Sequence, residues 1–529
     1  MSAAGTEAVS HTGSMPNIVL IMADQLTPFA TGAYGHPLVK TPAIDALAAR
    51  GVRFDSAYTN APLCAPARFA FMSGQHVTRI AAYDNASEFT SSIPTFAHHL
   101  RKLGYHTCLS GKMHFVGPDQ LHGFNERITT DVYPADFAWT PDWEMPDERI
   151  DKWYHNMDSV REAGVAATTF QIEYDEEVGF FAERKLFDYV RDADARPFMM
   201  VVSFIHPHDP YVALEKWWDL YDHDAIDMPD VSALPMDQQD AHSRRVMTGI
   251  EADVDVATDV QIRNARHAYY ANTSYVDHWV GRIMDTLHAA ALEENTIVIV
   301  TSDHGDMLGE RGLWYKMNFF EWSCRVPLIM AGPGLPSGRA VDNNVSLVDI
   351  FPTLLHAAKG ADPGPEITDA IDGRSLWGLA TGAVDPADDP DEAIAEYCAE
   401  CASHPCFMIR RGPYKYIHCD VDPPLLYNLR DDPNELTNLA ADPAHDNVAK
   451  AFAEEVRQRW DSEMIRDDVI ATQKQRRAVY QAMQDGTLTS WDFQPRRDAA
   501  NEYVRNHMDW TVAAAKSRFP PYQDGGEDP

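Results

Sequence analysis

Asn17-Ile18-Val19-Leu20-Ile21-Met22-Ala23-Asp24 is an almost uninterrupted apolar run that ends in a carboxylate. A run without polar alternation predicts a strand buried on both faces of a sheet. Further short apolar runs predict strands at 105–110, 198–205, 296–302 and 326–330. Helical spacing predicts helices between them at 41–50, 94–103, 178–191 and 268–292. This alternation predicts an α/β fold, with a large, mostly parallel central sheet sandwiched by helices.

Polar residues follow the ends of several of these predicted strands. Ligands of open α/β sheets bind beyond the carboxyl ends of the strands, so we expect these side chains to meet at one edge. Carboxylates at a strand end suit a divalent cation such as calcium or magnesium. The residues concerned are Asp24 and Gln25, Lys112 and His114, His206 and His208, and Asp303 and His304.

A second signal is Cys64-Ala65-Pro66-Ala67-Arg68, which opens a predicted helix. A lone cysteine is often only a small buried apolar residue. A helix N-terminus, however, stabilises negative charge, so an anionic ester would be favoured beside Cys64. Lys112 and Lys316 would offset the charge that develops on oxygen when such an ester is cleaved.

The acidic composition excludes some partners. Lys and Arg number 44 and Asp and Glu number 80, for a net charge of −36, which argues against nucleic-acid binding. The charge is compatible with a cationic or zwitterionic substrate, although an ordinary acidic surface explains it equally well. No apolar run is long enough for a membrane span and no secretory signal is recognisable, so a cytoplasmic location is predicted. Seven cysteines do not suggest a disulfide framework.

A chain of 529 residues predicts one large domain and a smaller one. After about residue 360 the composition changes, and segments rich in Pro and Asp predict loops. Short strands are predicted after them at 407–410 and 414–418. We therefore expect a smaller C-terminal α+β subdomain. The predicted divisions are a flexible leader at 1–15, a catalytic α/β domain at 16–375, the subdomain at 376–475 and an extended tail for oligomer contacts at 476–529.

The C-x-P-x-R pattern at Cys64, together with the strand-end residues, resembles the formylglycine-dependent sulfatases of the alkaline phosphatase superfamily. The resemblance implies that a formylglycine-generating or sulfatase-maturing enzyme oxidises Cys64 to formylglycine, whose hydrate supplies the nucleophilic hydroxyl. It implies a divalent metal ion that is held by Asp24, Gln25, Cys64, Asp303 and His304. Ca²⁺ is the preferred ion, and Mg²⁺ and Mn²⁺ are the alternatives. The family's usual Asp-Asp pair is Asp24-Gln25 here, so the site has one negative charge fewer.

The same resemblance implies roles for the remaining residues. Arg68 would pair with and orient the nucleophile, and Lys112 and Lys316 would cradle the sulfate. His208 would protonate the leaving alcohol, and His206 would be a packed neighbour. His114 would be the base that regenerates the aldehyde. The implied catalytic set is Cys64, Arg68, Lys112, His114, His208 and Lys316.

The segments 63–68, 83–89, 153–156 and 505–509 resemble the choline-sulfatase branch of that family. A trimethylammonium group cannot donate a hydrogen bond, so aromatic faces and carboxylates bind it. The resemblance implies an oligomer, a tetramer built as a dimer of dimers, in which a tail carboxylate reaches the neighbouring subunit's pocket. The implied substrate-binding residues are Asn85, Trp139, His155, Asn156, Glu396 and Asp509, with Glu400 as an alternative to Glu396.

Three functions are compatible with these residues. Hydrolysis of choline-O-sulfate to choline and sulfate is preferred. A promiscuous phosphonate monoester or phosphodiester hydrolase of the same superfamily is the second, and a non-catalytic choline-ester binding protein is the third, if Cys64 remains a thiol. Structural zinc is disfavoured because the C-x-x-C at Cys398 and Cys401 has no second ligand pair, although Cys406 and Cys419 follow.

Overall fold

The computed structural model describes residues 15–145, 155–192, 196–361, 370–487, 491, 493, 495 and 511–512. Its main element is an eight-stranded sheet of order β10-β2-β9-β8-β1-β6-β3-β4. Strand β9 runs antiparallel to both of its neighbours, whereas every other pair is parallel, so the predicted mostly parallel sheet is confirmed. The strands are β1 (Asn17–Asp24), β2 (Val52–Tyr58), β3 (His106–Gly111), β4 (Glu126–Arg127), β6 (Phe198–Pro207), β8 (Thr296–Ser302), β9 (Arg325–Ala331) and β10 (Arg339–Ser346).

Strand β1 is apolar throughout because both faces of the sheet are covered. Its residues alternate between two hydrophobic clusters, as the pleat of a strand requires. Ile21 belongs to the cluster that contains Trp279, whereas Leu20 belongs to the cluster that contains Phe69. All eight residues of β1 are buried.

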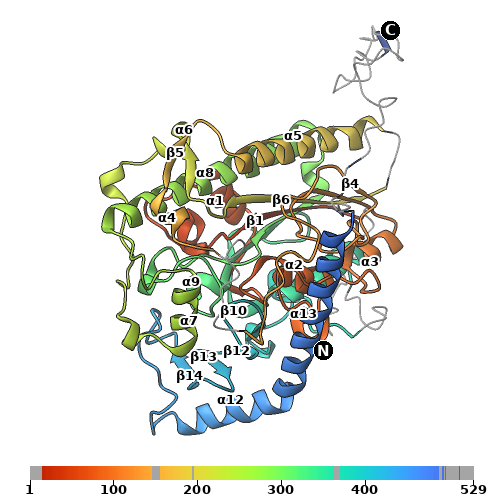
Figure 1. Cartoon of the computed structure of the whole chain (residues 1–529). Coiled ribbons are helices and arrows are strands. Elements are labelled where there is room, and N and C mark those ends of the chain that lie inside the picture. The colour runs from red at the N-terminus through yellow and green to blue at the C-terminus, as the bar shows by residue number, and fades with distance from the viewer. Residues whose placement is uncertain are drawn as a thin grey trace, which may run out of the picture.

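Helices form a layer on each side of the sheet (Figure 1). One layer contains α1 (Pro42–Ala49), α5 (Phe170–Arg191) and α8 (Asp259–Ala289), and the other contains α2 (Cys64–Ser73), α3 (Phe96–Lys102) and α10 (Ile350–Lys359). Helices α5 and α8 begin earlier than predicted, because Thr169 and Thr258 accept hydrogen bonds from first-turn N–H groups and so cap them. Within the described part of the chain, no helix is long and apolar enough to cross a membrane.

A second, four-stranded antiparallel sheet follows in the C-terminal part, as predicted. Its strands are β11 (Glu392–Tyr397), β12 (Cys406–Arg411), β13 (Tyr414–Cys419) and β14 (Leu425–Asn428), in that order. A short parallel pair, β5 (Gly164–Ala166) and β7 (Val212–Leu214), lies apart from both sheets. The remaining α-helices are α4 (Asp158–Arg161), α6 (Glu215–Trp218), α7 (Ala241–Gly249), α9 (Glu321–Cys324), α11 (Trp377–Thr381), α12 (Asp446–Arg459) and α13 (Ser462–Asp485).

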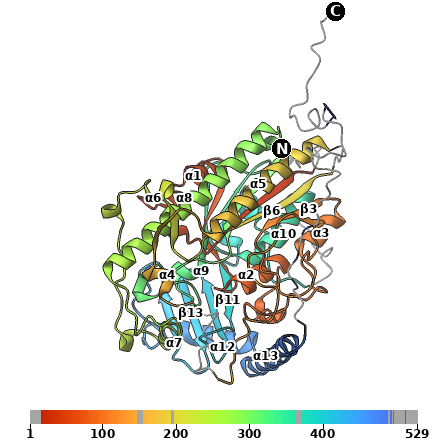
Figure 2. The same ribbon diagram turned by 45° about the horizontal axis from the view of Figure 1, so that its top comes forward.

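Helix α13 corrects the predicted start of the tail at 476, because it is continuous from Ser462 to Asp485. The guanidinium of Arg476 donates to both carboxylate oxygens of Asp84, at 2.5 and 2.7 Å. The Gln473 amide oxygen accepts from the backbone N–H of Trp143 at 2.9 Å. The helix lies along the outside of the α2–α3 layer (Figures 1 and 2), so it is part of the folded body rather than of a separate tail.

Candidate active site

The carboxyl ends of β1, β3, β6 and β8 bring the predicted polar residues to one edge of the sheet, beside the first turn of α2. Cys64 is the first residue of α2 and is buried. Its Sγ lies 3.2 Å from His304 Nε2 and 3.7 Å from Asp24 Oδ1. Residues at the ends of two strands, β1 and β8, therefore contact Cys64.

Asp24, Cys64, Asp303 and His304 form one compact cluster. Each offers a ligand atom, and these atoms all lie within 4.8 Å of one another. Burial lowers the pKa of His304 to about 4, so its imidazole is neutral. His304 Nδ1 donates to the Gly305 carbonyl at 3.0 Å, which leaves the Nε2 lone pair facing the two carboxylates. Two carboxylates and a neutral imidazole are a donor set that fits a divalent cation.

Cations surround these carboxylates. Burial opposes the ionisation of Asp24, but the charges of Lys112 and Arg68 outweigh it and hold the pKa of Asp24 well below the usual value. Lys112 makes a direct ion pair with Asp24. Arg68 donates from Nε to Asp303 Oδ2 at 2.8 Å and from Nη2 to Asp24 Oδ2 at 3.3 Å.

Arg68 therefore fixes the carboxylates of Asp24 and Asp303, and its role in orienting the nucleophile stays a prediction. Its Nη1 also donates to the Lys112 carbonyl at 2.7 Å and to Ser203 Oγ at 2.9 Å. One guanidinium thus ties together the ends of β1, β3, β6 and β8.

Lys316 and His208 form a contacting pair. Lys316 Nζ lies 2.8 Å from His208 Nε2 and 2.6 Å from the amide oxygen of Gln25. His208 Nδ1 donates to the Asp209 carbonyl at 2.6 Å. Burial and the charge of Lys316 lower the pKa of His208 well below its usual value. The pKa of Lys316 is raised, because nearby groups that can carry negative charge (Cys64, Asp209 and Asp24) outweigh burial. The proton of this pair consequently resides on Lys316.

Gln25 is held by residues that the sequence analysis missed. Its Nε2 donates to Asp306 Oδ2 at 2.6 Å, and Tyr211 OH donates to the same oxygen at 2.8 Å. Burial raises the pKa of Asp306 to about 6. These contacts turn the amide oxygen of Gln25 toward Lys316. Its role as a metal ligand stays a prediction.

His114 lies between Lys112 and an aromatic wall. Its ring centroid is 5.0 Å from that of Tyr133 and 5.6 Å from that of Trp139, and the two aromatic rings are 4.9 Å apart. Within the described residues neither ring nitrogen of His114 has a hydrogen-bond partner, although the residue is buried. Burial, followed by Lys112, lowers its pKa to about 3, so it is a neutral base facing the site.

His155 and Asn156 make different contacts, and the role of each in substrate binding stays a prediction. His155 stacks on Tyr315, with centroids 4.5 Å apart, and its Nδ1 lies 3.3 Å from Asp209 Oδ2. The Asn156 side-chain oxygen instead accepts from the backbone N–H of Asp158 at 2.8 Å, at the start of α4. The backbone carbonyl of Asn156 accepts from Tyr315 OH at 2.5 Å.

Asn85 contacts the helix that carries Cys64. Its side-chain oxygen accepts from the backbone N–H of Ala65 at 3.0 Å. The contact satisfies a first-turn N–H of α2, which the helix itself cannot do. Asn85 therefore positions the first turn from which Cys64 projects.

Glu396 makes contacts within the protein, and its role in binding choline stays a prediction. Its carboxylate is buried and already accepts from Thr78 N at 2.7 Å, Thr78 Oγ1 at 3.0 Å and Trp460 Nε1 at 2.6 Å. These contacts use it to join β11 to η3 (Val77–Arg79) and the end of α12. The alternative, Glu400, is close enough to Lys316 to feel its charge. Burial, followed by Asp84, raises its pKa to about 7, and Lys316 lowers it.

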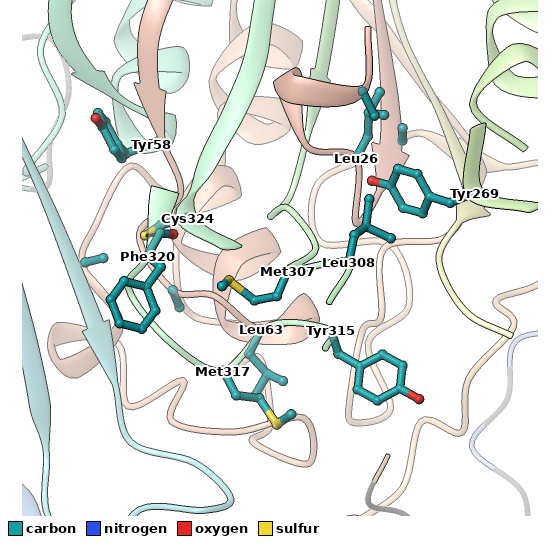
Figure 3. Close-up of a cluster of buried hydrophobic side chains, with 14 of the residues drawn as sticks. Leu26, Tyr58, Leu63, Tyr269, Met307, Leu308, Tyr315, Met317, Phe320 and Cys324 are labelled. Atoms are coloured by element: carbon teal, nitrogen blue, oxygen red, sulfur yellow. Dashed lines mark hydrogen bonds between the residues drawn. The ribbon is translucent and has the colours of Figure 1, made fainter. Parts of the chain in front are cut away.

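Hydrophobic side chains hold the catalytic segments in place (Figure 3). Leu63 precedes Cys64, Leu26 follows Gln25, and Met317 follows Lys316, and all three are buried. The backbone N–H of Met317 donates to the Pro62 carbonyl at 3.0 Å, which joins the segment of Lys316 to that of Cys64.

Asp509 lies outside the described residues, as do Trp153 and Tyr154. None of the seven cysteines, all of which lie in the described part of the chain, forms a disulfide bond. Two groups of possible metal ligands occur in the described part of the chain. They are the Cys64 cluster and His155 with His208 and Asp209, and neither includes the four C-terminal cysteines.

Sequence comparison, which does not depend on the fold or the site, shows the family to which the chain belongs. The chain belongs to the sulfatase family, whose model, described as Sulfatase, matches residues 16–361. It is therefore a sulfuric ester hydrolase, and the family implies a metal and a formylglycine. A model described as choline sulfatase enzyme C terminal matches residues 467–519, and one described as N-sulphoglucosamine sulphohydrolase, C-terminal, matches residues 309–462.

Among its relatives, the choline-sulfatase of Rhizobium meliloti (strain 1021) is 47% identical over 515 residues, which is 96% of this chain and 99% of that protein. Arylsulfatase K of Rattus norvegicus is 30% identical over 465 residues, covering 81% of this chain and 75% of that protein. The crystal structure of the phosphonate monoester hydrolase of Agrobacterium radiobacter has a TM-score of 0.67 at 25% identity, covering 91% of this chain and 100% of that one.

Proposed function

We propose that this enzyme hydrolyses choline-O-sulfate to choline and sulfate, with Cys64 converted to formylglycine. The observation that carries the proposal is the arrangement around Cys64, which joins a carboxylate–imidazole cluster to an aromatic wall of Tyr133 and Trp139. The cluster suits a metal and a sulfate, and the wall suits a quaternary ammonium. The 47% identity to a choline-sulfatase supports the same substrate.

The state of Cys64 supports the modification. Burial, followed by the charge of Asp24, raises the pKa of its thiol to about 12. A neutral, buried thiol is a poor nucleophile. The hydrate of an aldehyde at this position supplies one hydroxyl to attack sulfur and a second to expel sulfate, which a thiol cannot do.

A divalent cation would be held by Asp24, Asp303, His304 and the modified residue 64, with Gln25 in reach, and when bound it would polarise the sulfate and the attacking hydroxyl. Ca²⁺ is the ion we favour, because the ligands are mainly oxygens.

The chain's own residues supply the proton transfers and the charge balance. Lys112 and Lys316 both lie near enough to act on Cys64, and they would offset the negative charge that develops on the sulfate oxygens. Because Lys316 holds the proton of its pair with His208, the leaving alkoxide takes a proton from Lys316, with His208 relaying it or orienting the amine. His114, whose imidazole is neutral, would be the base for the second half of the reaction.

The cationic end of the substrate would lie against Trp139 and Tyr133, with Glu400 as the carboxylate in place of Glu396. Lys112 Nζ is 4.2 Å from the centroid of the Tyr133 ring, so one side of that ring is already in contact with a cation. This leaves the adjoining Trp139 as the main aromatic surface for the trimethylammonium group.

Mass spectrometry and a substrate comparison test the proposal. The peptide that contains residue 64 should show formylglycine in active enzyme, and Cys64→Ser should abolish turnover. Choline-O-sulfate should be cleaved far faster than 4-nitrophenyl sulfate or a phenyl phosphonate ester. Full activity with an unmodified cysteine would overturn the formylglycine, and faster cleavage of the phosphonate would favour the second candidate, for which the Agrobacterium structure is the precedent.

Partners and location belong to the same proposal. A formylglycine-generating or sulfatase-maturing enzyme would act on Cys64, and the protein would be a cytoplasmic homotetramer in which Asp509 reaches a neighbouring pocket. Sedimentation of the full chain and of a chain ending before Arg496 tests the oligomer. An active tetramer without the tail would remove Asp509 from the site.

A further inference from the structure

Two thiols outside the active site face each other across the C-terminal sheet. Cys406 on β12 and Cys419 on β13 are Cα partners in the antiparallel register, and both are buried. Directly opposed residues of such a pair have Cα atoms about 4.5–5.5 Å apart, which falls within the range that a disulfide spans. The backbone therefore already has the spacing for a bond between the two sulfurs.

A small cavity gives access to this pair. It has a volume of about 30 Å³ and is lined by Cys406, Cys419, His242, Asn318 and Asp422, among others. That volume admits a water-sized molecule. Hydrogen peroxide is only slightly larger than water, whereas a peptide disulfide such as oxidised glutathione is far too large. Of these oxidants, the cavity therefore admits peroxide.

Cys419 is the more reactive of the two thiols. The neighbouring Cys406 thiol, followed by the backbone N–H of Val421, lowers the pKa of Cys419 against the opposing effect of burial. The nearby Asp422 raises the pKa of Cys419, and the guanidinium of Arg245, which donates to Asp422 at 2.8 and 2.5 Å, opposes this effect. Reactive cysteines have this kind of environment, since the thiolate is the form that attacks.

The cavity wall also holds the segment that carries Lys316. His242 Nε2 donates to the Met317 carbonyl at 2.6 Å. Asn318 Nδ2 donates to the Lys316 carbonyl at 3.2 Å. A change at the two cysteines thus reaches the backbone of Lys316 through one layer of side chains.

We propose that Cys406 and Cys419 are a peroxide-sensitive dithiol whose disulfide displaces the segment of Lys316 and slows turnover. The Cys419 thiolate attacks one peroxide oxygen and hydroxide leaves, which gives a sulfenic acid at Cys419. The Cys406 sulfur then attacks the Cys419 sulfur, so an S–S bond forms and the S–O bond of the sulfenic acid breaks. The hydroxide that leaves takes up the proton lost from the Cys406 thiol and becomes water. Peroxide is reduced by two electrons, and the dithiol is oxidised by the same two. An added thiol reverses the change.

The test uses the full-length, modified enzyme after reduction and then brief exposure to hydrogen peroxide. Digestion with trypsin cleaves after Arg410, Arg411 and Lys415, so the two cysteines fall on separate peptides. We expect a cross-linked peptide pair lighter by two hydrogens and a fall in kcat of about tenfold, equivalent to about 1.4 kcal/mol on the barrier. Dithiothreitol should restore both.

Cys406→Ser and Cys419→Ser should keep the basal kcat and lose the response to peroxide. Cys401→Ala is the matched control, because Cys401 shares the tryptic peptide of Cys406 and should leave the response intact. A disulfide that joins Cys398 or Cys401 instead would overturn the pairing. Complete formation of the Cys406–Cys419 bond with unchanged kcat would overturn its effect on Lys316. Since both readouts compare oxidised with reduced enzyme on any substrate that it turns over, the result does not depend on choline-O-sulfate being the natural one.

Discussion

Lys316 Nζ lies 2.8 Å from His208 Nε2, and the two side chains share one acidic proton at the end of β6. The resemblance to known sulfatases assigns the acid to His208, but burial and the ammonium of Lys316 keep that imidazole neutral. We therefore propose that the pair is the donor to the leaving alcohol, with Lys316 as the group that holds the proton. This distinction decides which of the two residues, Lys316 or His208, should cause the larger loss of activity when it is replaced.

Replacing Lys316 with Ala should lower kcat/KM for choline-O-sulfate by about 10²–10⁴-fold, the usual contribution of a positioned acid. The loss should be smaller for 4-nitrophenyl sulfate, because nitrophenolate leaves without a proton. Steady-state kinetics with both esters measure the difference. His206→Asn is the control, since His206 bonds Asp175 at 2.7 Å and not Lys316. Equal losses on both esters would assign Lys316 to sulfate binding alone.

Glu400 predicts an acid limb in the pH profile. Its pKa of about 7 means that the carboxylate is protonated below that pH and ionised above it. If the ionised form binds the trimethylammonium group, kcat/KM for choline-O-sulfate should fall as the pH decreases below 7, since this parameter reports the free enzyme. Glu400→Gln should lower kcat/KM and abolish this limb.

Glu396→Gln is the matched variant for the same experiment. Glu396 bonds Thr78 and Trp460, so its replacement should reduce the melting temperature and leave the acid limb in place. The reverse pattern, with the limb lost in Glu396→Gln and kept in Glu400→Gln, would return the choline site to Glu396.

Trp139 should contribute to KM rather than to the chemical step. Its ring borders His114 and Tyr133, and a cation held against a tryptophan face gains about 0.5–2 kcal/mol. Trp139→Ala should therefore raise KM for choline-O-sulfate by about 2–30-fold. Trp139→Phe should recover part of the loss, and a neutral alkyl sulfate of similar size should show little change. An equal increase for the neutral ester would indicate a purely steric role.

The sheet and the strand-end residues could be predicted because they follow from local pattern. The apolar run of β1 and the position of Asp24 after it determine where a metal site can form, and parallel strands place Lys112 and Asp303 at the same edge. Cys64 could be found because its pentapeptide is a contiguous motif. The antiparallel direction of β9 could not be predicted, because a short apolar run does not indicate whether the strand runs parallel or antiparallel to its neighbours.

Contacts between segments that are far apart in the chain could not be predicted from the sequence. Asp306 was within reach, three residues after Asp303, but only the folded chain shows it against Gln25. Glu396 lies on strand β11 and Glu400 lies just beyond it, so their positions in the sequence do not distinguish their roles. Their contacts do, because Glu396 accepts from Thr78 and Trp460, whereas Glu400 feels the charge of Lys316. The extent of α13 was missed because its buried side includes Gln473 and Arg476, which are polar and give no apolar stripe.

Gln25 predicts how the metal site responds to charge. Gln25→Asp would place a second carboxylate beside Asp306, whose Oδ2 now accepts from Gln25 Nε2 at 2.6 Å. Like charges repel, so without metal the variant should melt at a lower temperature than the parent enzyme. Added Ca²⁺ should then raise its melting temperature by more than it raises that of the parent, because tighter binding to the folded state gives greater stabilisation.

Scanning calorimetry with EDTA, Ca²⁺ and Mg²⁺ measures these shifts, and Gln25→Asn is the control that shortens the side chain without adding charge. Should Ca²⁺ stabilise Gln25→Asp no more than it stabilises Gln25→Asn, residue 25 is outside the reach of the metal. Chelation should also remove activity, and the ion that restores it identifies the natural metal.

Two helix glycines predict opposite effects of the same substitution. A Cβ on Gly179, in α5, would meet the Trp279 ring of α8 at 2.3 Å, whereas a Cβ on Gly281 would meet only Ala43 Cβ, at 3.4 Å. Gly179→Ala should thus force the α5–α8 contact apart and cost about 1–3 kcal/mol, the typical penalty of overpacking. Gly281→Ala should stabilise the protein by about 0.5–1 kcal/mol, because alanine loses less backbone entropy than glycine in a helix. Urea unfolding of both variants checks the difference in sign. Equal destabilisation by both would mean that α8 has no room at Gly281 either, and unchanged stability of Gly179→Ala would mean that Trp279 can move aside.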